Sequence, residues 1–340
     1  MQFRSLGCSG LLVSTVGFGT MTVGGTLADN AAFRLMDQAL DAGINLFDVS
    51  EMADGLQQNL RREFGVSERA VGRWLQTRNR DAVIIATKVC GANDTPVLGT
   101  TGVVPHIRGG NTTLDRFHIT RALEGSLRRL GTDHVDLYQF HWPDRTVPMA
   151  EQLEAVAHLI AAGKVRYAGI SNETAWGLTR FIATAESAGL PRMVSIQNQY
   201  NLLDRTFEHG LQEVCLRERV GMLAFSPLAM GVLSGKYTTE RTPPSARLRK
   251  FPRYQSRWGR REQVSAAARF AQSARTLGHN PAELALAWVR HQPGVASVLS
   301  SCTSVEQVSS LIASAALGIT DAIREEIEAA AAVDLHGSAS

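Results

Sequence analysis

The sequence predicts an α/β protein that folds as a (β/α)8 TIM barrel, with an N-terminal β-hairpin that caps the bottom of the barrel. Three observations indicate this fold: eight short apolar runs recur along the chain, helical patterns lie between them, and no GxGxxG motif follows the first run. Strands that alternate with helices over one domain's length favour a closed barrel over a doubly wound sheet. The missing glycine motif weakens the Rossmann alternative. We therefore expect one barrel domain over residues 1–340.

The apolar runs are the candidate strands of the barrel. They cover residues 16–20, 44–49, 83–89, 134–141, 165–172, 195–201, 222–228 and 297–302. Ahead of them, the segments FRSL and LLVS flank the turn-forming sequence GCSG, which predicts the hairpin. In a barrel, this hairpin would plug the N-terminal end.

Two segments show clear signals for the start of a helix. Asp29 is expected to cap a helix that runs to Asp41. Asn280, Pro281 and Glu283 have the spacing of an N-cap, a first-turn proline and a capping glutamate. Both signals fit helices that connect successive strands.

The composition excludes several classes of protein. A net charge of +3 over 340 residues argues against a nucleic-acid binder that works by bulk electrostatics. The four cysteines lie far apart without CxxC spacing, so neither a disulfide framework nor a structural zinc site is expected. No apolar run approaches the roughly 18 residues of a membrane span. We expect a cytoplasmic protein with reduced thiols and no membrane partner; its oligomeric state is open, and a homo-oligomer is one option.

Three polar residues define the candidate catalytic set. Asp48, Lys88 and His141 each lie at or near the C-terminal end of a candidate strand, where barrel enzymes place their catalytic groups. Strand alternation puts His141 on the inward face of its strand, whereas Tyr138 and Phe140 face the helices. A structural ion pair with a histidine nearby is the alternative interpretation.

The rest of the chain favours the catalytic interpretation. The motifs GINLFD, IATKV, LEGSLRRLGTDHVDLYQFHWPDR, GKVRYAGISN, QNQYN, FSPLAMGVLSGKY and PAELALAWV resemble, in order and spacing, those of the aldo/keto reductases. The resemblance covers about residues 3–312 and is nearest to the bacterial Tas-like and potassium-channel β-subunit-like branch. It implies an oxidoreductase in which NADPH gives its hydride to a carbonyl carbon, and in which Asp48, Lys88 and His141 fill three of four catalytic places.

The fourth place is changed. The family has a tyrosine five residues after the aspartate, and this chain has Ala53 there. No tyrosine occurs before Tyr138, so no local shift of the alignment restores one. A positioned acid is typically worth about 10²- to 10⁴-fold in rate, so its loss predicts impaired carbonyl reduction with cofactor binding largely intact.

The cofactor side is predicted mainly from the resemblance. Residues 241–261 are rich in arginine and contain no acidic residue, and they follow the seventh strand, where barrels often bind phosphate. The resemblance implies that Ser226 and Leu228 lie along the pyrophosphate and that Lys236 and Arg247 lie near the phosphates. It also implies that Phe225 stacks on the nicotinamide ring, and that the carboxamide is bound by Ser171, Asn172 and Gln197.

The segment VLSSCTSVEQVSSL departs from the family. Gln307 of the expected adenosine clasp is retained, but Leu311 occupies the place of an asparagine. We expect NADP, with NAD less favoured.

The substrate pocket is less well defined. Met21, Trp142, the loop of residues 91–115 and the segment around Trp258 are expected to bound it, and His106 and Arg108 are candidate contacts to a polar substrate. The sequence does not name the carbonyl or alcohol substrate.

Two other functions fit the same barrel. One is a cofactor-binding sensor or partner subunit without turnover, and the other is a different reaction such as elimination or epimerisation. A metal-dependent hydrolase would need several converging His and carboxylate ligands, which this set does not supply, so no metal is expected.

Overall fold

A computed structural model describes residues 1–25, 27–51, 65–90, 113–237, 242, 246–251 and 254–333. Eight parallel strands close a barrel, which confirms the predicted fold. In barrel order from the first, they are β3 (Val16–Gly19), β4 (Leu46–Asp48), β5 (Ile84–Val89), β6 (Val135–Phe140), β7 (Val165–Ser171), β8 (Met193–Gln199), β9 (Gly221–Phe225) and β10 (Val295–Ser300). β10 pairs with β3 to close the ring. Each of the eight predicted runs overlaps one of these strands: five runs contain their strand whole, whereas β8, β9 and β10 begin one or two residues before the predicted runs.

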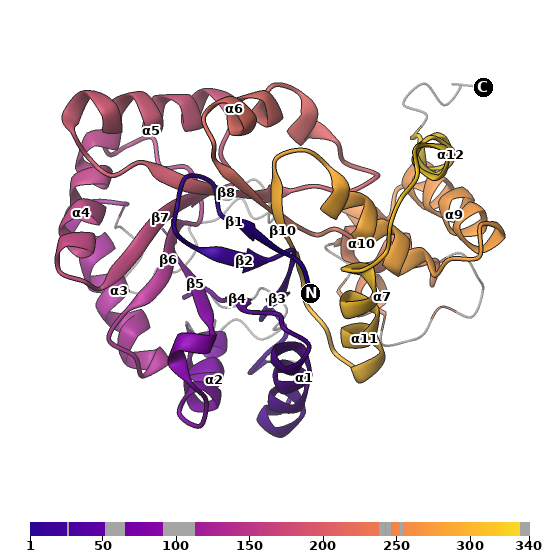
Figure 1. Ribbon diagram of the computed structural model, residues 1–340, viewed down its shortest axis with the longest axis horizontal. Coiled ribbons are helices and arrows are strands. Elements are labelled where there is room, and N and C mark those ends of the chain that lie inside the picture. Colours follow the sequence, from indigo (N-terminus) through magenta and orange to yellow (C-terminus); the bar gives the residue numbers. More distant parts are fainter. Residues whose placement is uncertain are drawn as a thin grey trace.

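Helices surround the barrel on its outer side (Figure 1). The longer ones are α1 (Asp29–Asp41), α2 (Val66–Leu75), α3 (Arg116–Leu130), α4 (Met149–Ala161), α5 (Ala175–Ala188), α6 (Leu211–Arg217), α9 (Arg261–Thr276), α10 (Pro281–His291), α11 (Val305–Ser314) and α12 (Asp321–Ala331). The short helices α7 (Arg247–Lys250) and α8 (Gln255–Trp258) and the 3-10 turn η4 (Ala229–Ser234) lie between β9 and α9. Among the described residues, no helix is both long enough and apolar enough to cross a membrane.

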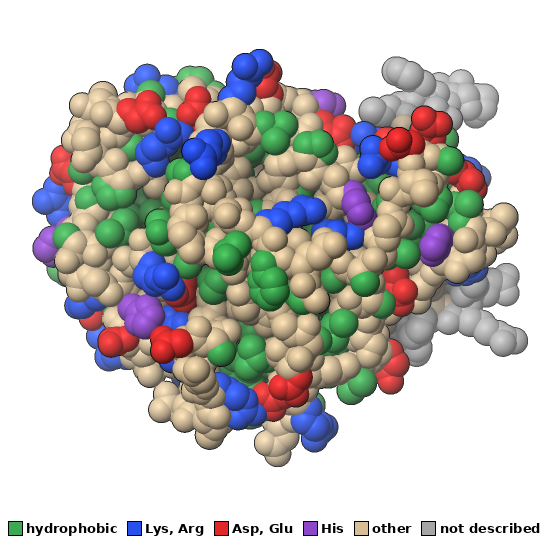
Figure 2. Space-filling model, in the orientation of Figure 1, with side chains coloured by type: hydrophobic (Ala, Val, Ile, Leu, Met, Phe, Trp, Pro, Cys, Tyr) green, Lys and Arg blue, Asp and Glu red, His purple; other side chains and the backbone are tan. Residues whose placement is uncertain are grey.

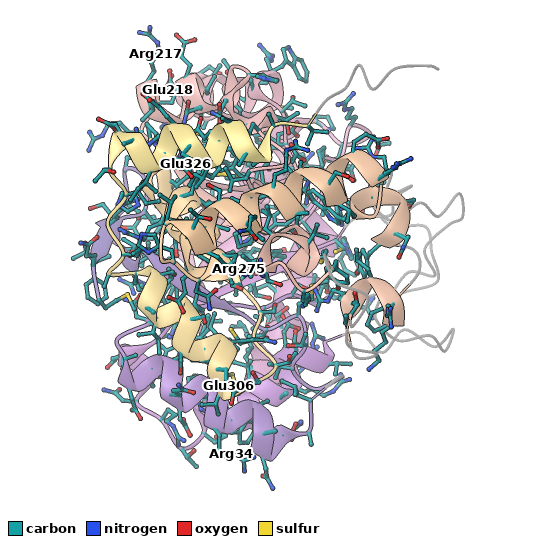
Figure 3. All side chains as sticks on the ribbon, turned by 90° about the vertical axis from the view of Figure 1, so that its right-hand side faces the viewer. Arg34, Arg217, Glu218, Arg275, Glu306 and Glu326 are labelled. Carbon is teal, nitrogen blue, oxygen red and sulfur yellow. The ribbon has the colours of Figure 1, made fainter. Side chains whose placement is uncertain are left out.

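The last helix packs against another helix rather than on the barrel strands. Figure 3 shows α12 alongside α9, and the Ser273 hydroxyl donates a hydrogen bond to the Glu326 carboxylate at 2.6 Å. The Arg269 guanidinium donates to the carbonyls of Ala330 and Ala332 at the end of α12. These contacts fix the C-terminal part of the described chain beside α9.

One of the two predicted helix starts is correct in its N-cap and its first-turn proline, whereas the Glu283 carboxylate accepts from the Ser310 hydroxyl. The Asn280 side chain accepts hydrogen bonds from the backbone N–H groups of Ala282 and Glu283, as an N-cap does. Asp29 is not a cap: it is the first helical residue, Ala28 precedes it without a side-chain cap, and the Asp29 carboxylate pairs with Arg73. The capping prediction for Asp29 was therefore wrong by one position.

The predicted hairpin is present and lies across the barrel end that Figures 1 and 2 face. β1 (Phe3–Ser5) pairs antiparallel with β2 (Leu12–Ser14). The side chains of Leu6, Leu11 and Val13 are buried in one cluster with inward residues of the barrel strands, among them Leu137 and Leu223. The hairpin therefore closes the bottom of the barrel with apolar packing.

Alternation along β6 follows the prediction. Leu137 packs inside the barrel with the hairpin cluster. On the opposite face, the Tyr138 hydroxyl donates to the carbonyl of Ile119 in α3, and the Phe140 ring lies 6.1 Å from the Phe181 ring of α5. The next inward position after the strand is His141, so this alternation directs its side chain into the C-terminal end of the barrel.

Candidate functional site

A buried ion pair forms the base of the candidate site. The Lys88 ammonium lies 2.6 Å from Oδ1 of Asp48 and also donates to the Val49 carbonyl at 3.0 Å. Lys88 is only 3% exposed. The backbone carbonyl of Asp48 accepts hydrogen bonds from the N–H and the hydroxyl of Thr20, which ties the end of β4 to the end of β3. Asp48 is thus held from both of its neighbouring strands.

The predicted carboxamide-binding residues extend this ion pair into a network. Nε2 of Gln197 donates to Oδ1 of Asp48 at 2.8 Å. The Ser171 hydroxyl donates to the Gln197 backbone carbonyl at 2.6 Å, and Nδ2 of Asn172 donates to the Ser171 hydroxyl and to the His141 carbonyl. The structure therefore brings six predicted residues together at the ends of β4 to β8: Asp48, Lys88, His141, Ser171, Asn172 and Gln197.

His141 follows directly after β6 and is held by backbone and ring contacts. Its N–H donates to the Val89 carbonyl at 2.9 Å, and its ring stacks on Trp142 with centroids 5.2 Å apart. Burial and the nearby Lys88 ammonium hold the pKa of His141 well below its usual value. The imidazole is accordingly neutral near pH 7.

Sequence reasoning missed Cys90 as a neighbour of this histidine. Its Sγ lies 3.1 Å from Nδ1 of His141. The backbone of Cys90 is fixed on both sides, since its N–H donates to Oε1 of Glu51 and its carbonyl contacts Nε2 of His118 at 2.7 Å. One signal could have found it: Cys90 lies two residues after Lys88 and so shares the inward face of the same strand.

Backbone strain collects at two strand ends of the site. Four of the five described non-glycine residues with positive φ follow or end β7 and β9: Asn172 (58°), Ser226 (53°), Ala229 (47°) and Met230 (57°). Such conformations cost about 1–3 kcal/mol each and cluster where a protein binds ligands. Two of the four, Asn172 and Ser226, are residues that the sequence singled out for cofactor contacts.

Two cations lie close together beside the loop that follows β9. Burial and the neighbouring Arg247 lower the pKa of Lys236. Nη1 of Arg247 contacts the sulfur atoms of Met21 and Met230 at 3.6 and 3.3 Å. A Cβ added at Gly231 would lie 2.6 Å from the Lys236 ammonium. Within the described residues neither cation pairs with a carboxylate, so the pair fits an anionic group such as a phosphate.

The remaining predicted residues differ in how far they are exposed. Phe225, which ends β9, and Leu228 are half-buried. Gln307 is exposed and its Oε1 accepts from the N–H and the hydroxyl of Thr303, whereas Leu311 is fully buried in the core. Trp258 is also a core residue, 1% exposed. Ala53, His106 and Arg108 lie outside the described residues.

The side chains of the described residues do not match the ligand sets that hold metal ions. The described residues contain no group of three or more His, Cys, Asp or Glu side chains that could hold a metal ion. The polar groups that converge here are one ion pair, amides, a hydroxyl, a thiol and a neutral imidazole. This set suits hydrogen bonding to a polar organic ligand.

Sequence comparisons identify the family to which this barrel belongs. The family model described as "Aldo/keto reductase family" matches residues 15–332. The chain is 40% identical to "Protein tas" of Escherichia coli (strain K12), with 97% of each chain covered. It is 35% identical to "Uncharacterized oxidoreductase YrpG" (91% of this chain, 89% of the relative) and 32% identical to "Aldo-keto reductase YhdN" (86% and 82%), both of Bacillus subtilis (strain 168). The chain belongs to the aldo/keto reductase family.

Proposed function

We propose that this oxidoreductase binds NADPH and uses it to reduce a small carbonyl compound, or oxidises the corresponding alcohol, with impaired turnover. One observation carries the proposal: a continuous hydrogen-bond network joins the Asp48–Lys88 ion pair to the His141 segment through the residues expected to hold the nicotinamide. When bound, NADPH would supply the hydride for the carbonyl carbon.

The residues around the network suit the parts of that cofactor. Nε2 of Gln197 is engaged by Asp48, while its Oε1 makes no hydrogen bond within the described residues and can accept from the carboxamide NH2 group. Ser171 and Asn172 would complete the carboxamide contacts, and Phe225 would lie against the ring. Ser226 and Leu228 would line the pyrophosphate.

The charged end of the cofactor has its own support. The paired cations Lys236 and Arg247 would hold phosphate groups, and an anion between them would offset the burial and the repulsion by Arg247 that lower the pKa of Lys236. Gln307 would contact the adenosine end. We expect NADPH to be preferred over NADH, because the 2′-phosphate adds two negative charges near these cations.

Delivery of the proton is the weak step. The Ala53 methyl group has no proton to donate, so the developing alkoxide must be met by the Lys88 ammonium, by His141 or by water. None of these is the positioned acid of the family. We therefore expect a rate about 10²- to 10⁴-fold below that of an enzyme with the tyrosine.

A second function, a cofactor-binding sensor or partner subunit without turnover, is favoured by one observation: no tyrosine precedes Tyr138. NADPH binding is common to both functions, and turnover separates them. The first experiment is a titration with NADPH and NADH by tryptophan fluorescence, followed by a carbonyl panel and the nicotinamide absorbance. Tight binding with slow oxidation would support the reductase, tight binding without oxidation the sensor, and no binding would overturn both.

Restoring the hydroxyl tests the assignment of Ala53. We predict that Ala53→Tyr raises the carbonyl reduction rate by at least about 10²-fold, because it returns a positioned acid to the site. Ala53→Phe is the matched control, since it adds the same ring without the hydroxyl and should leave the rate unchanged. An unchanged rate in a folded Ala53→Tyr variant that binds NADPH would contradict the proposal.

A further inference from the structure

Cys90 and His141 come from the ends of adjacent strands, and their side chains meet inside the site. The Sγ–Nδ1 distance of 3.1 Å is well within hydrogen-bonding range for sulfur. Two arrangements are chemically consistent with it. Either a neutral thiol donates to an unprotonated Nδ1, or a protonated Nδ1 donates to sulfur. The two arrangements leave opposite hydrogen-bonding capacity at the other ring nitrogen, Nε2.

The surroundings favour the neutral thiol as donor. Burial and the carboxylates of Glu51 and Glu68 raise the pKa of Cys90 well above its usual value, against a smaller opposing effect of the Lys88 ammonium. Burial and the same ammonium lower the pKa of His141. Both side chains are therefore uncharged, which excludes a thiolate as acceptor. A neutral thiol sulfur is a weak acceptor, whereas an unprotonated imidazole nitrogen is a good one, so the contact is better matched with S–H as the donor and Nδ1 as the acceptor.

We propose that Cys90 is a positioning residue: its thiol donates to Nδ1 of His141 and holds the imidazole in the Nε2–H tautomer. Nε2 makes no hydrogen bond to any group within the described residues, so its N–H is available to a bound molecule. Such a nitrogen can donate to a carbonyl or alkoxide oxygen and cannot accept a proton. This inference rests on the proposed function of His141 in carbonyl chemistry.

The contacts around the pair make the arrangement rigid. The Cys90 backbone is held on one side by Glu51 and on the other by His118. The ring of His141 is stacked on Trp142 with an interplanar angle of 6°. The stacking restrains the ring of His141, and the backbone contacts fix the place from which the Cys90 side chain extends. The position of the thiol is therefore set by the backbone at the end of β5, and the ring orientation by the stacking partner.

Nitrogen NMR of the protein without cofactor tests the inference directly. The protein is labelled with ¹⁵N-histidine, and long-range ¹H–¹⁵N correlations at neutral pH report which ring nitrogen carries the proton. The His141 signals are identified by their loss in His141→Gln. We expect an Nε2–H pattern with a hydrogen-bonded Nδ1. An Nδ1–H pattern in the wild-type protein would overturn the inference.

Two variants distinguish the hydrogen bond that the thiol donates from the effect of side-chain size. Cys90→Ala removes the donor, so the Nδ1 resonance should move and the acid dissociation constant of His141 should fall about three- to tenfold, because the neutral ring loses one hydrogen bond. Cys90→Ser keeps a donor and should keep the wild-type Nδ1 resonance and pKa. Identical His141 signals and pKa in Cys90→Ala and wild type would refute the role of Cys90.

The readout does not depend on NADPH or turnover. A wild-type Nε2–H pattern that needs Cys90 would stand even if the protein failed to bind NADPH, which would refute only the proposed function. Thermal unfolding of each variant checks that the barrel is intact. If the protein does turn over, Cys90→Ala should lower kcat more than Cys90→Ser does, while the NADPH affinity stays unchanged.

Discussion

At the residue scale, the buried Asp48–Lys88 ion pair has two consistent interpretations, one structural and one chemical. The pair lies at the ends of β4 and β5, and its contacts with Thr20 and Gln197 reach the ends of β3 and β8. A charge that remains buried after its partner is removed is costly, so neither partner can be replaced alone without destabilising the site, whatever the chemical role of the pair. The two roles are compatible, because a rigid ion pair is also a well-positioned one.

We predict that Lys88→Met lowers the free energy of unfolding by about 3 kcal/mol, since it leaves the Asp48 carboxylate, whose side chain is only 13% exposed, without its counter-charge. Urea denaturation measures this loss. The double variant Asp48→Asn/Lys88→Met removes both charges and should recover part of the stability. A loss below about 1 kcal/mol in Lys88→Met would show that solvent compensates the carboxylate as it does at a surface pair.

Single residues also mark the limit of what the sequence could predict. Asp48, Lys88 and His141 were predictable because each is a polar residue at the end of an apolar run. The contact between Cys90 and His141 joins positions 51 residues apart, and it depends on the register of β5 against β6. A sequence pattern predicts which face of a strand a residue lies on, but not which residue of the neighbouring strand it contacts. The contact of the Cys90 thiol with His141 was therefore not predicted.

At the element scale, the hairpin closes the barrel because its turn comes very close to the barrel backbone. Gly7 has a φ of +58°, and a Cβ there would lie 2.2 Å from the Val194 carbonyl oxygen and 2.7 Å from that of Arg219. To make room for a side chain at this position, backbone groups in β8 and just before β9 would have to move, and that movement is costly. Glycine is needed here for space as well as for conformation.

A matched pair of glycine variants tests whether the hairpin turn needs glycine for space. Gly163 also has a positive φ, +71°, but a Cβ there would contact nothing within 4 Å. We predict that Gly163→Ala costs about 1 kcal/mol through backbone strain alone. Gly7→Ala should cost at least about 3 kcal/mol, because strain and overpacking add. Equal midpoints in thermal unfolding would mean that the hairpin shifts freely on the barrel.

Elements were more predictable than their ends. All eight strands were found because buried parallel strands are continuous apolar runs, and the Asn280 cap because capping is local. The Asp29 cap failed because an acidic residue is favourable both as a cap and in the first turn, and its pairing with Arg73, 44 positions away, is not a local signal. Local chemistry predicts that a helix starts; tertiary contacts decide at which residue.

At the scale of the whole molecule, the barrel separates stability from function along its axis. The hairpin and its apolar cluster occupy one end, and the polar network occupies the other, as is usual for barrels of this type. Chain segments from residue 20 to residue 247 meet at the end that carries the polar network. The cofactor proposal therefore depends on the loop after β9, which is far in sequence from the ion pair.

Arg247 and Arg249 offer the sharpest test of that proposal, because both lie in the short helix α7. Arg247 is half-buried against Met21 and Met230 and close to Lys236, whereas Arg249 is exposed. We predict that Arg247→Gln weakens NADPH binding by about 10- to 100-fold, the effect of losing a hydrogen bond to a charged group. Arg249→Gln should bind NADPH as the wild type does.

Fluorescence titration with both dinucleotides completes the test. If Arg247 contacts the 2′-phosphate, Arg247→Gln should weaken NADPH and spare NADH; if it contacts the pyrophosphate, both should weaken together. In either case raising the salt concentration should reduce the wild-type affinity more than that of Arg247→Gln, because one charge pair has been removed. Equal losses in Arg247→Gln and Arg249→Gln would instead indicate a diffuse attraction by the whole basic segment, and would remove the Lys236–Arg247 pair as the phosphate site.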